Sequence, residues 1–164
     1  MAASWASACP DGPLTSRHLA RSHLASTVAS SVAPAGELLG LFKEALAAHR
    51  AGQLDEAIAA CRRSIELKPE FADVHYKLGN FLDDAGRPDE AEAAYRKAIA
   101  LRPDHAESHC DLGKALWKQG KLAQALSSLE RGHELGSRRK NWPYPSAEWV
   151  RECRELLERD GRPR

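Results

Sequence analysis

The segment ADVHYKLGNFLDDAGRPDEAEAAYRKAIALRPDH (72–105) decides the fold, because its pattern recurs on both sides of it at a fixed interval. Glycine, alanine and proline residues keep a spacing of 34 positions: Gly52, Gly86 and Gly120; Ala57, Ala91 and Ala125; Pro69 and Pro103. A fixed period of about 20 to 50 residues is the mark of a protein built from stacked structural repeats. The sequence therefore predicts three units, which cover 38–71, 72–105 and 106–139.

Each unit is expected to form two helices. In the central unit, Val74 and Leu78 lie on one apolar helical face that continues with the same spacing. Gly86 is predicted to end this helix, because a left-handed residue at a helix end costs least as glycine. Pro88 is tolerated in the first turn of the next helix, and Pro103 prevents that helix from continuing.

Helices are predicted at 38–51, 55–67, 72–85, 89–101, 106–119, 122–135 and 146–159. The small residues Gly79 and Ala91 are expected to let the two central helices approach closely. Each helix pair leaves an apolar face bare and needs a neighbour. The last helix, with Ser146 as its predicted N-cap, is interpreted as a cap over the third unit.

The central unit closely resembles the tetratricopeptide (TPR) repeat, through Leu78, Gly79, Gly86, Ala91, Tyr95, Ala98 and Pro103. The flanking units keep part of the same pattern: Leu112, Gly113, Gly120 and Ala125 in the third, and Gly52, Ala57 and Pro69 in the first. The resemblance implies an all-α TPR-type α-solenoid, in which antiparallel helix pairs wind into a right-handed superhelix. It covers 38–139.

Three regions are expected along the chain. Residues 1–36, rich in serine and alanine, are predicted to be a flexible or poorly ordered segment; a short helix over 19–32 and an organelle transit peptide are the alternatives. Residues 37–139 hold the three TPR repeats. Residues 140–164 comprise a linker rich in proline and aromatic residues, the capping helix and a tail, and Trp142 and Tyr144 of the linker are expected to fold back on the solenoid.

Composition narrows the class of protein. The formal net charge of the 164 residues is only +1, so no nucleic-acid partner is predicted, and the basic run 138–140 is interpreted as a solvated helix end. No apolar stretch is long enough for a membrane span. The four cysteines have neither metal-site nor disulfide-framework spacing. Cys61 is interpreted as a small buried hydrophobe in a reducing compartment, which predicts a cytoplasmic protein.

No chemistry is predicted for this chain. His105, His109, Cys110 and Asp111 lie near one another in the sequence, but two ligands on one helix do not complete a four-coordinate site. No nucleophile elbow, phosphate-binding glycine loop or HExxH zinc motif is present. We therefore expect no catalytic residues, no cofactor and no metal.

The TPR resemblance implies a concave groove, lined by the first helix of each pair, that binds a peptide or a helical segment of another protein. The positions expected to contact that partner are Phe42, Lys43, Tyr76, Lys77, Asn80, Asp84, Asp111, Lys114, Trp117 and Lys118. The wider set of groove positions adds Leu39, Leu46, His49, Arg50, Asp73, Asp83, Glu107 and Cys110. Tyr76 and Trp117 are the expected anchors, since large amphipathic rings dominate binding energy. The alternative for Trp117 is that it packs against the capping segment.

Some TPR proteins hold the C-terminal carboxylate of chaperones, but of the corresponding positions here only Lys77 is suitable, and Glu107 repels a carboxylate. A ligand of alternating charge with one or two apolar anchors fits better. The leading hypothesis is a non-catalytic adaptor or scaffold. The alternative is a docking or regulatory module of a multidomain enzyme, a kinase or a protein glycosyltransferase. Metal or redox sensing is a third class.

Overall fold

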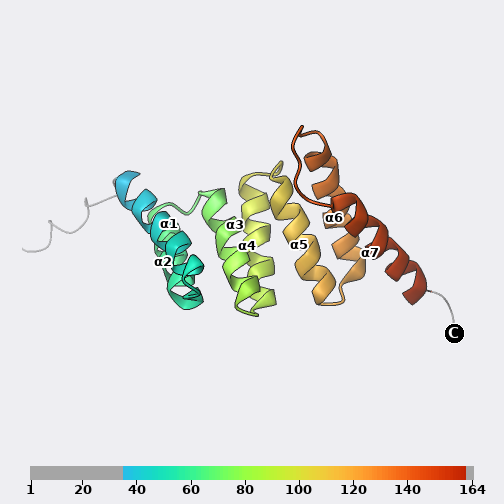
Figure 1. Ribbon diagram of the computed structural model, residues 1–164, viewed down its shortest axis with the longest axis horizontal. Helices are drawn as coiled ribbons and strands as arrows, with labels where there is room; N and C mark the ends of the chain where they lie inside the picture. The colour runs from blue at the N-terminus through green and yellow to red at the C-terminus, as the bar shows by residue number, and fades with distance from the viewer. Residues whose placement is uncertain (1–34, 162–164) are drawn as a thin grey trace, which may run out of the picture. The chain divides into compact units, whose positions relative to one another are not determined.

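The computed structural model describes residues 35–161, which form α-helices and no strand within that range. The helices are α1 (Ala35–Arg50), α2 (Leu54–Leu67), α3 (Ala72–Asp84), α4 (Pro88–Leu101), α5 (Ala106–Lys118), α6 (Leu122–Ser137) and α7 (Ser146–Asp160) (Figure 1). The predicted helices are confirmed to within three residues at each end. The largest difference is at α1, which begins three residues earlier than predicted. Expectations for 1–34 lie outside the described residues.

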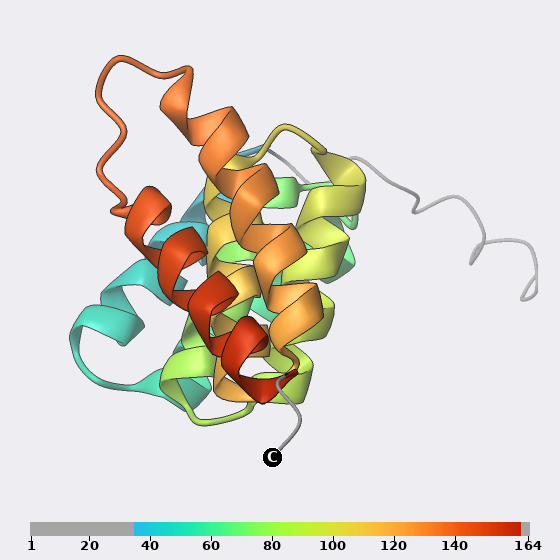
Figure 2. The same ribbon diagram turned by 90° about the vertical axis from the view of Figure 1, so that its right-hand side faces the viewer.

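The helices form antiparallel pairs, α1 with α2, α3 with α4 and α5 with α6, and each pair packs on the next through α2 with α3 and α4 with α5. α7 packs alongside α6 and covers the open side of the third pair (Figures 1 and 2). Within 35–161 no helix is long and apolar enough to cross a membrane.

The turn inside each pair has the same construction. Gly52, Gly86 and Gly120 have φ of 77°, 70° and 75°, in the left-handed region that favours glycine. The N–H of the following residue donates to the carbonyl five residues earlier, at 2.8 to 2.9 Å in all three turns. This hydrogen bond is the one that satisfies the last carbonyls of a helix in a Schellman motif. The period of glycines therefore follows from a backbone conformation that recurs once in every unit.

α3 and α4 cross at Gly79, as the sequence predicts. A Cβ atom at Gly79 would lie 2.5 Å from Cε1 of Tyr95, so only a residue without a side chain fits beneath this ring. Tyr95 is 2% exposed and Ala91 is fully buried in the same core. The predicted core role of Cys61 is also confirmed, because its side chain is fully buried and burial raises the pKa of its thiol to about 12.

His75 and His109 occupy equivalent positions, 34 residues apart, at the junctions between units. Nε2 of His75 lies 2.8 Å from the carbonyl oxygen of Pro69, and Nε2 of His109 lies 3.0 Å from that of Pro103. Each ring N–H therefore satisfies a carbonyl of the preceding turn. These histidines therefore tie each unit to the turn before it, which is a structural role.

Candidate functional site

A pocket of about 300 Å³ lies along the first helices of the three pairs, with contributions from α4 and from the segment that connects α6 to α7. Six of the ten predicted contact residues line it: Tyr76, Lys77, Asn80, Asp84, Asp111 and Lys114. Leu46, His49 and Asp83 of the wider set line it as well. Phe81, Tyr95 and Tyr144 also line the pocket and do not belong to the predicted set.

Tyr76 is the centre of a hydrogen-bond network that joins two units. Its hydroxyl donates to Oδ2 of Asp111 at 2.9 Å and lies 3.3 Å from the hydroxyl of Tyr144. Its side chain is 9% exposed, and its ring meets that of His105 edge-on at 4.8 Å. Burial, and then the nearby Asp111 carboxylate, raise the pKa of Tyr76, so its hydroxyl remains a hydrogen-bond donor.

Asp111 accepts hydrogen bonds from two sides of the pocket. Besides the hydroxyl of Tyr76, Nζ of Lys114 lies 3.4 Å from its Oδ1. Burial raises the pKa of Asp111, while Lys114 acts in the opposite direction and lowers it. Lys114 is itself held over the ring of Trp149 in α7, at 5.0 Å from the ring centroid, which is within the range of a cation–π contact.

The connecting segment Trp142–Pro145 folds back on the solenoid, as the sequence predicts. The ring of Trp142 packs so closely on Gly136 that no Cβ atom fits there. Trp142 and Tyr144 stack at 4.8 Å, and Tyr144 meets Trp149 edge-on at 5.8 Å. Tyr144 is thereby fixed as the wall of the pocket next to α5 and α7.

The predicted N-cap role of Ser146 is wrong. Ser146 is the first residue of α7, preceded by Pro145 at the cap position, and no side-chain hydrogen bond caps this helix. Its side chain is 1% exposed, and its Oγ accepts from Nε1 of Trp142 at 2.9 Å and lies 2.9 Å from Nδ1 of His133. The hydroxyl therefore joins the connecting segment to α6 instead of capping α7.

Along the pocket, side-chain hydrogen bonds and ion pairs join each repeat to the next at a regular spacing in the sequence. His49 pairs with Asp84, Tyr76 with Asp111, and Asp83 with Lys118, and in each pair the partners are 35 residues apart. The first and third distances are both 2.7 Å. The ring of His49 also stacks on Phe81 at 4.5 Å. The pocket wall is thus held together by one unit bonding to the next.

The other four predicted contact residues do not line this pocket. Phe42 packs near Phe71, with ring centroids 6.0 Å apart, and Lys43 is exposed. Trp117 is half-buried and packs against the core, and Lys118 is exposed and pairs with Asp83. Their part in binding stays a prediction.

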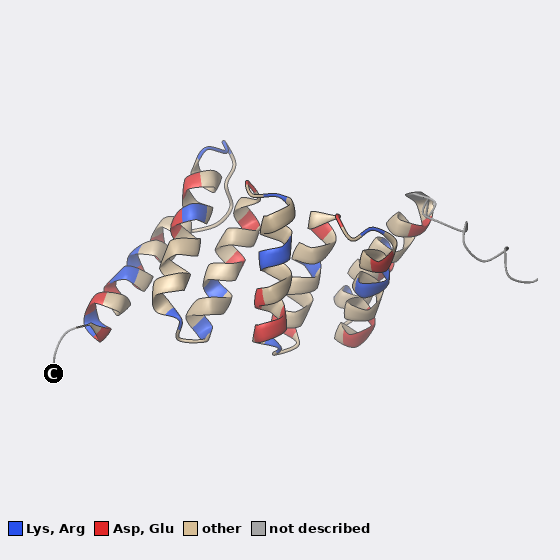
Figure 3. Ribbon diagram, turned by 180° about the vertical axis from the view of Figure 1, so that it is seen from behind, with Lys and Arg blue, Asp and Glu red and all other residues tan. Residues whose placement is uncertain are grey.

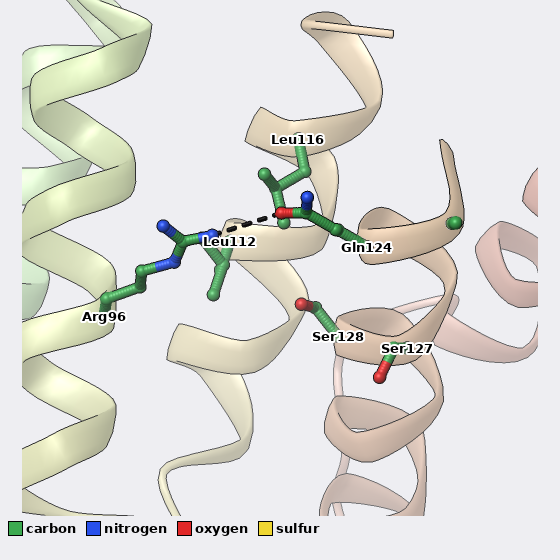
Figure 4. A pocket seen from close by; sticks show the side chains of 7 residues that line it. Arg96, Leu112, Leu116, Gln124, Ser127 and Ser128 are labelled. Atoms are coloured by element: carbon green, nitrogen blue, oxygen red, sulfur yellow. Dashed lines mark hydrogen bonds between the residues drawn. The ribbon is translucent and has the colours of Figure 1, made fainter. Parts of the chain in front are cut away.

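Two further pockets lie elsewhere. One of about 390 Å³ lies between α4, α5 and α6, where Nη2 of Arg96 donates to Oε1 of Gln124 at 3.2 Å beside Leu112 (Figure 4). The other, of about 300 Å³, is lined by Arg102, Asp104, His105, Glu107 and Arg139. Within this lining Arg139 donates to Glu107 at 2.6 Å, and Arg102 donates to Asp73, which lies outside the lining. Neither pocket combines aromatic rings with unpaired charge.

Charged residues of both signs are interspersed along the helices (Figure 3). In the basic run, Arg138 bonds to Glu134 and Arg139 to Glu107. Among residues 35–161, no three His, Cys, Asp or Glu side chains are placed to hold a metal ion together. His105 instead caps α5, because its Nδ1 accepts from the N–H of Ser108 at 3.2 Å.

The family model of the tetratricopeptide repeat matches residues 18–73, 42–106 and 76–138, which together make up well over half of the chain. The chain belongs to the tetratricopeptide repeat family, and its fold is an all-α TPR solenoid. No curated protein was found that matches it.

Three solved structures illustrate the likeness. The first TPR domain of Spaghetti (RPAP3), bound to an HSP90 peptide, is 20% identical with a TM-score of 0.69, over 75% of this chain and 94% of that one. The Yersinia enterocolitica type III secretion chaperone SycD, in complex with a peptide of the translocator YopD, is 18% identical with a TM-score of 0.68, over 74% and 95%. A mutant of the Thermobaculum terrenum O-GlcNAc transferase is 27% identical with a TM-score of 0.60, over 65% of this chain and 20% of the transferase.

Proposed function

We propose that this protein is a non-catalytic adaptor that binds an extended segment of another protein in the pocket along α1, α3 and α5. The observation that carries the proposal is the composition of that pocket. Aromatic walls from Tyr76, Tyr95 and Tyr144 surround an amide and charges of both signs. Rings supply contact area at a low cost in conformational entropy, and fixed polar groups supply specificity. The peptide complexes of the first TPR domain of Spaghetti and of the chaperone SycD support this function.

Asn80 is suited to hold the backbone of such a segment. The hydroxyl of Tyr95 donates to Oδ1 of Asn80 at 2.9 Å, which fixes the orientation of the amide. Asn80 also hydrogen-bonds to the side chain of Tyr76, which lowers the pKa of Tyr76 against the effect of burial. An amide NH₂ carries two N–H donors, so Asn80 can still donate to a peptide carbonyl in the pocket.

The polarity of the pocket argues for a ligand other than a strongly acidic chain end. Asp83, Asp84 and Asp111 all line it, and of the positions that hold carboxylates in some TPR proteins only Lys77 carries a suitable group. Carboxylates placed close to like charges repel them. We therefore propose a segment that carries both charges. The buried free thiols of Cys61, Cys110 and Cys153 support a reducing, cytoplasmic location for this adaptor.

A pull-down from a lysate of the source cells tests this function. Lys77→Ala with Asp84→Ala removes two half-exposed or exposed groups of the pocket and leaves the core intact. Tyr76→Ala is less suitable, because truncating a buried aromatic ring costs about 3–5 kcal/mol of stability. Lys97→Ala with Glu152→Ala, both exposed and outside the pocket lining, is the matched control, because it also removes one positive and one negative charge.

The groove variant is expected to lose partners that wild type and the control variant retain, while all three proteins keep the same helical content by circular dichroism. Retention of the same partners by both variants would show that this pocket is not the binding surface.

A second candidate function is a docking module of a multidomain enzyme, which the likeness to the O-GlcNAc transferase favours. This chain spans one fifth of that protein, so the proposal concerns only the repeat part. Reading the coding sequence on both sides of the chain tests it: an in-frame catalytic domain supports the candidate, and in-frame stop codons on both sides contradict it.

A further inference from the structure

Lys77 and Asp84 are the two charged groups of the pocket without a partner of full opposite charge. Nζ of Lys77 lies 5.2 Å from the ring centroid of Tyr76 and forms no ion pair with any residue in 35–161. Asp84 is 53% exposed, and its partner at 2.7 Å is His49, whose imidazole is charged only when protonated. Both groups are therefore available to an incoming ligand.

The remaining carboxylates of the pocket are paired. Asp83 lies 2.7 Å from the ammonium of Lys118, and Asp111 lies 3.4 Å from that of Lys114. A ligand charge gains little at a carboxylate that already has a cation, because the two cations repel each other. Lys77 and Asp84, both on α3, are thus the two pocket charges that no full opposite charge neutralises.

The spacing of these two groups matches an extended chain. Lys77, Asn80 and Asp84 are related by steps of three and four residues and therefore lie on one face of α3. Seven residues of helix rise by about 10 Å. In the extended polyproline II conformation, three residues span about 9 Å and complete one turn, so side chains three residues apart lie on the same side of the peptide. An extended peptide along α3 can accordingly place one charge on Lys77, its backbone on Asn80 and the opposite charge on Asp84.

We propose that the pocket selects an extended segment that carries one acidic and one basic side chain three residues apart, with the acid on Lys77 and the base on Asp84. This inference rests on the proposed function, because it names the kind of segment that the same pocket takes. The order of the two charges in the peptide is free, since reversing the direction of the chain exchanges the ends.

Four blocked peptides test the inference, with binding measured by chemical-shift titration of the full-length ¹⁵N-labelled protein. The mixed probe is acetyl-Ala-Glu-Phe-Ala-Arg-Ala-amide. Two probes carry either two Glu or two Arg at the charged positions, and a fourth carries Glu and Arg side by side. Wild type should bind the mixed, spaced probe more tightly than each of the others, by about fivefold, the ratio that corresponds to one partly exposed ion pair.

Charge reversals provide a direct check. Lys77→Glu should shift the preference to the doubly basic probe, and Asp84→Lys should shift it to the doubly acidic probe. Lys97→Glu, an exposed reversal on α4 outside the pocket, should leave the ranking unchanged.

Equal binding of all four probes by wild type overturns the charge selection, including the proposal of a segment with both charges. The adaptor function itself is then still decided by the pull-down. Equal binding of the spaced and adjacent probes overturns the extended geometry. Absence of binding to any probe also overturns the inference, while the proposed function is decided by whether the groove variant loses partners in the pull-down.

Discussion

Replacing Gly79 by alanine measures how closely α3 and α4 are packed. The new Cβ atom would lie 2.5 Å from Cε1 and 2.6 Å from Cδ1 of Tyr95. Carbon atoms in contact normally lie about 3.5–4.0 Å apart, so the ring or the helices must move by about 1 Å. The ring has little room, because Tyr95 is 2% exposed and its hydroxyl is bonded to Asn80 at 2.9 Å.

The expected magnitude is the difference of two effects. Alanine is favoured over glycine in a helix by about 1 kcal/mol, whereas overpacking a core typically costs about 1–3 kcal/mol. Gly79→Ala should therefore lower the free energy of unfolding by up to about 2 kcal/mol, and a shift of the midpoint in urea, followed by circular dichroism, measures it.

Gly40→Ala is the matched control for this prediction. Gly40 lies in α1, is exposed, and has no atom within 4 Å of the position of a new Cβ. This variant should be more stable than wild type by about 0.5–1 kcal/mol, since only the helix propensity acts. If Gly79→Ala stabilises the protein as much as Gly40→Ala does, the two helices are not in close contact at Gly79.

Three further predictions concern turns and titrating groups. Gly86→Ala should cost about 1–2 kcal/mol, because φ is 70° and the space around it is open, so the loss is purely conformational; an unchanged melting temperature contradicts the left-handed turn. Asp111→Asn should stabilise the protein at neutral pH: the folded pKa is raised above the ordinary 3.8, so ionised Asp111 costs stability once the pH exceeds the folded pKa. The gain should disappear below about pH 4, and urea midpoints across pH that show no such convergence contradict it. Burial lowers the pKa of His105 below its ordinary value of 6.5. The contribution of neutral His105 to stability is therefore present above pH 6.5 and is lost as the pH falls through the folded pKa. Once Nδ1 is protonated, it no longer accepts a hydrogen bond from the N–H of Ser108. His105→Asn keeps a capping acceptor and should therefore show a smaller drop in urea midpoint between pH 7 and 5; an equal drop would exclude His105 as the titrating group.

The fold could be predicted from the sequence because its local rules repeat. Gly52, Gly86 and Gly120 each require the same left-handed turn, and a turn at a fixed interval determines the helix lengths between them. The prediction for Ser146 was wrong because a serine before a helix has two uses that look alike in sequence. Its hydroxyl can cap the helix or bond to a neighbouring segment, and here it accepts a hydrogen bond from Nε1 of Trp142.

The candidate site was only partly predictable. Positions on α3 and α5 could be assigned because the family pattern sets which helical face lines the groove. Tyr95 was missed because the family pattern makes it the core aromatic of α4, although it also lines the pocket and its hydroxyl donates to Asn80. Tyr144 belongs to a segment without periodicity, and its place depends on Trp142 and Trp149, which are contacts that no local pattern encodes.

The pocket-side bonds between residues 35 positions apart are unevenly distributed between the two joints of the stack. On the pocket side, two such bonds, Tyr76 with Asp111 and Lys118 with Asp83, brace the joint between the second and third repeats. The joint between the first and second repeats has one, from His49 to Asp84. A ligand cation on Asp84 competes with His49 for this carboxylate, so we expect an occupied pocket to weaken this bond between the first and second repeats and to leave the two bonds at the other joint in place. Ligand binding would then be coupled to how firmly the first repeat is held to the second.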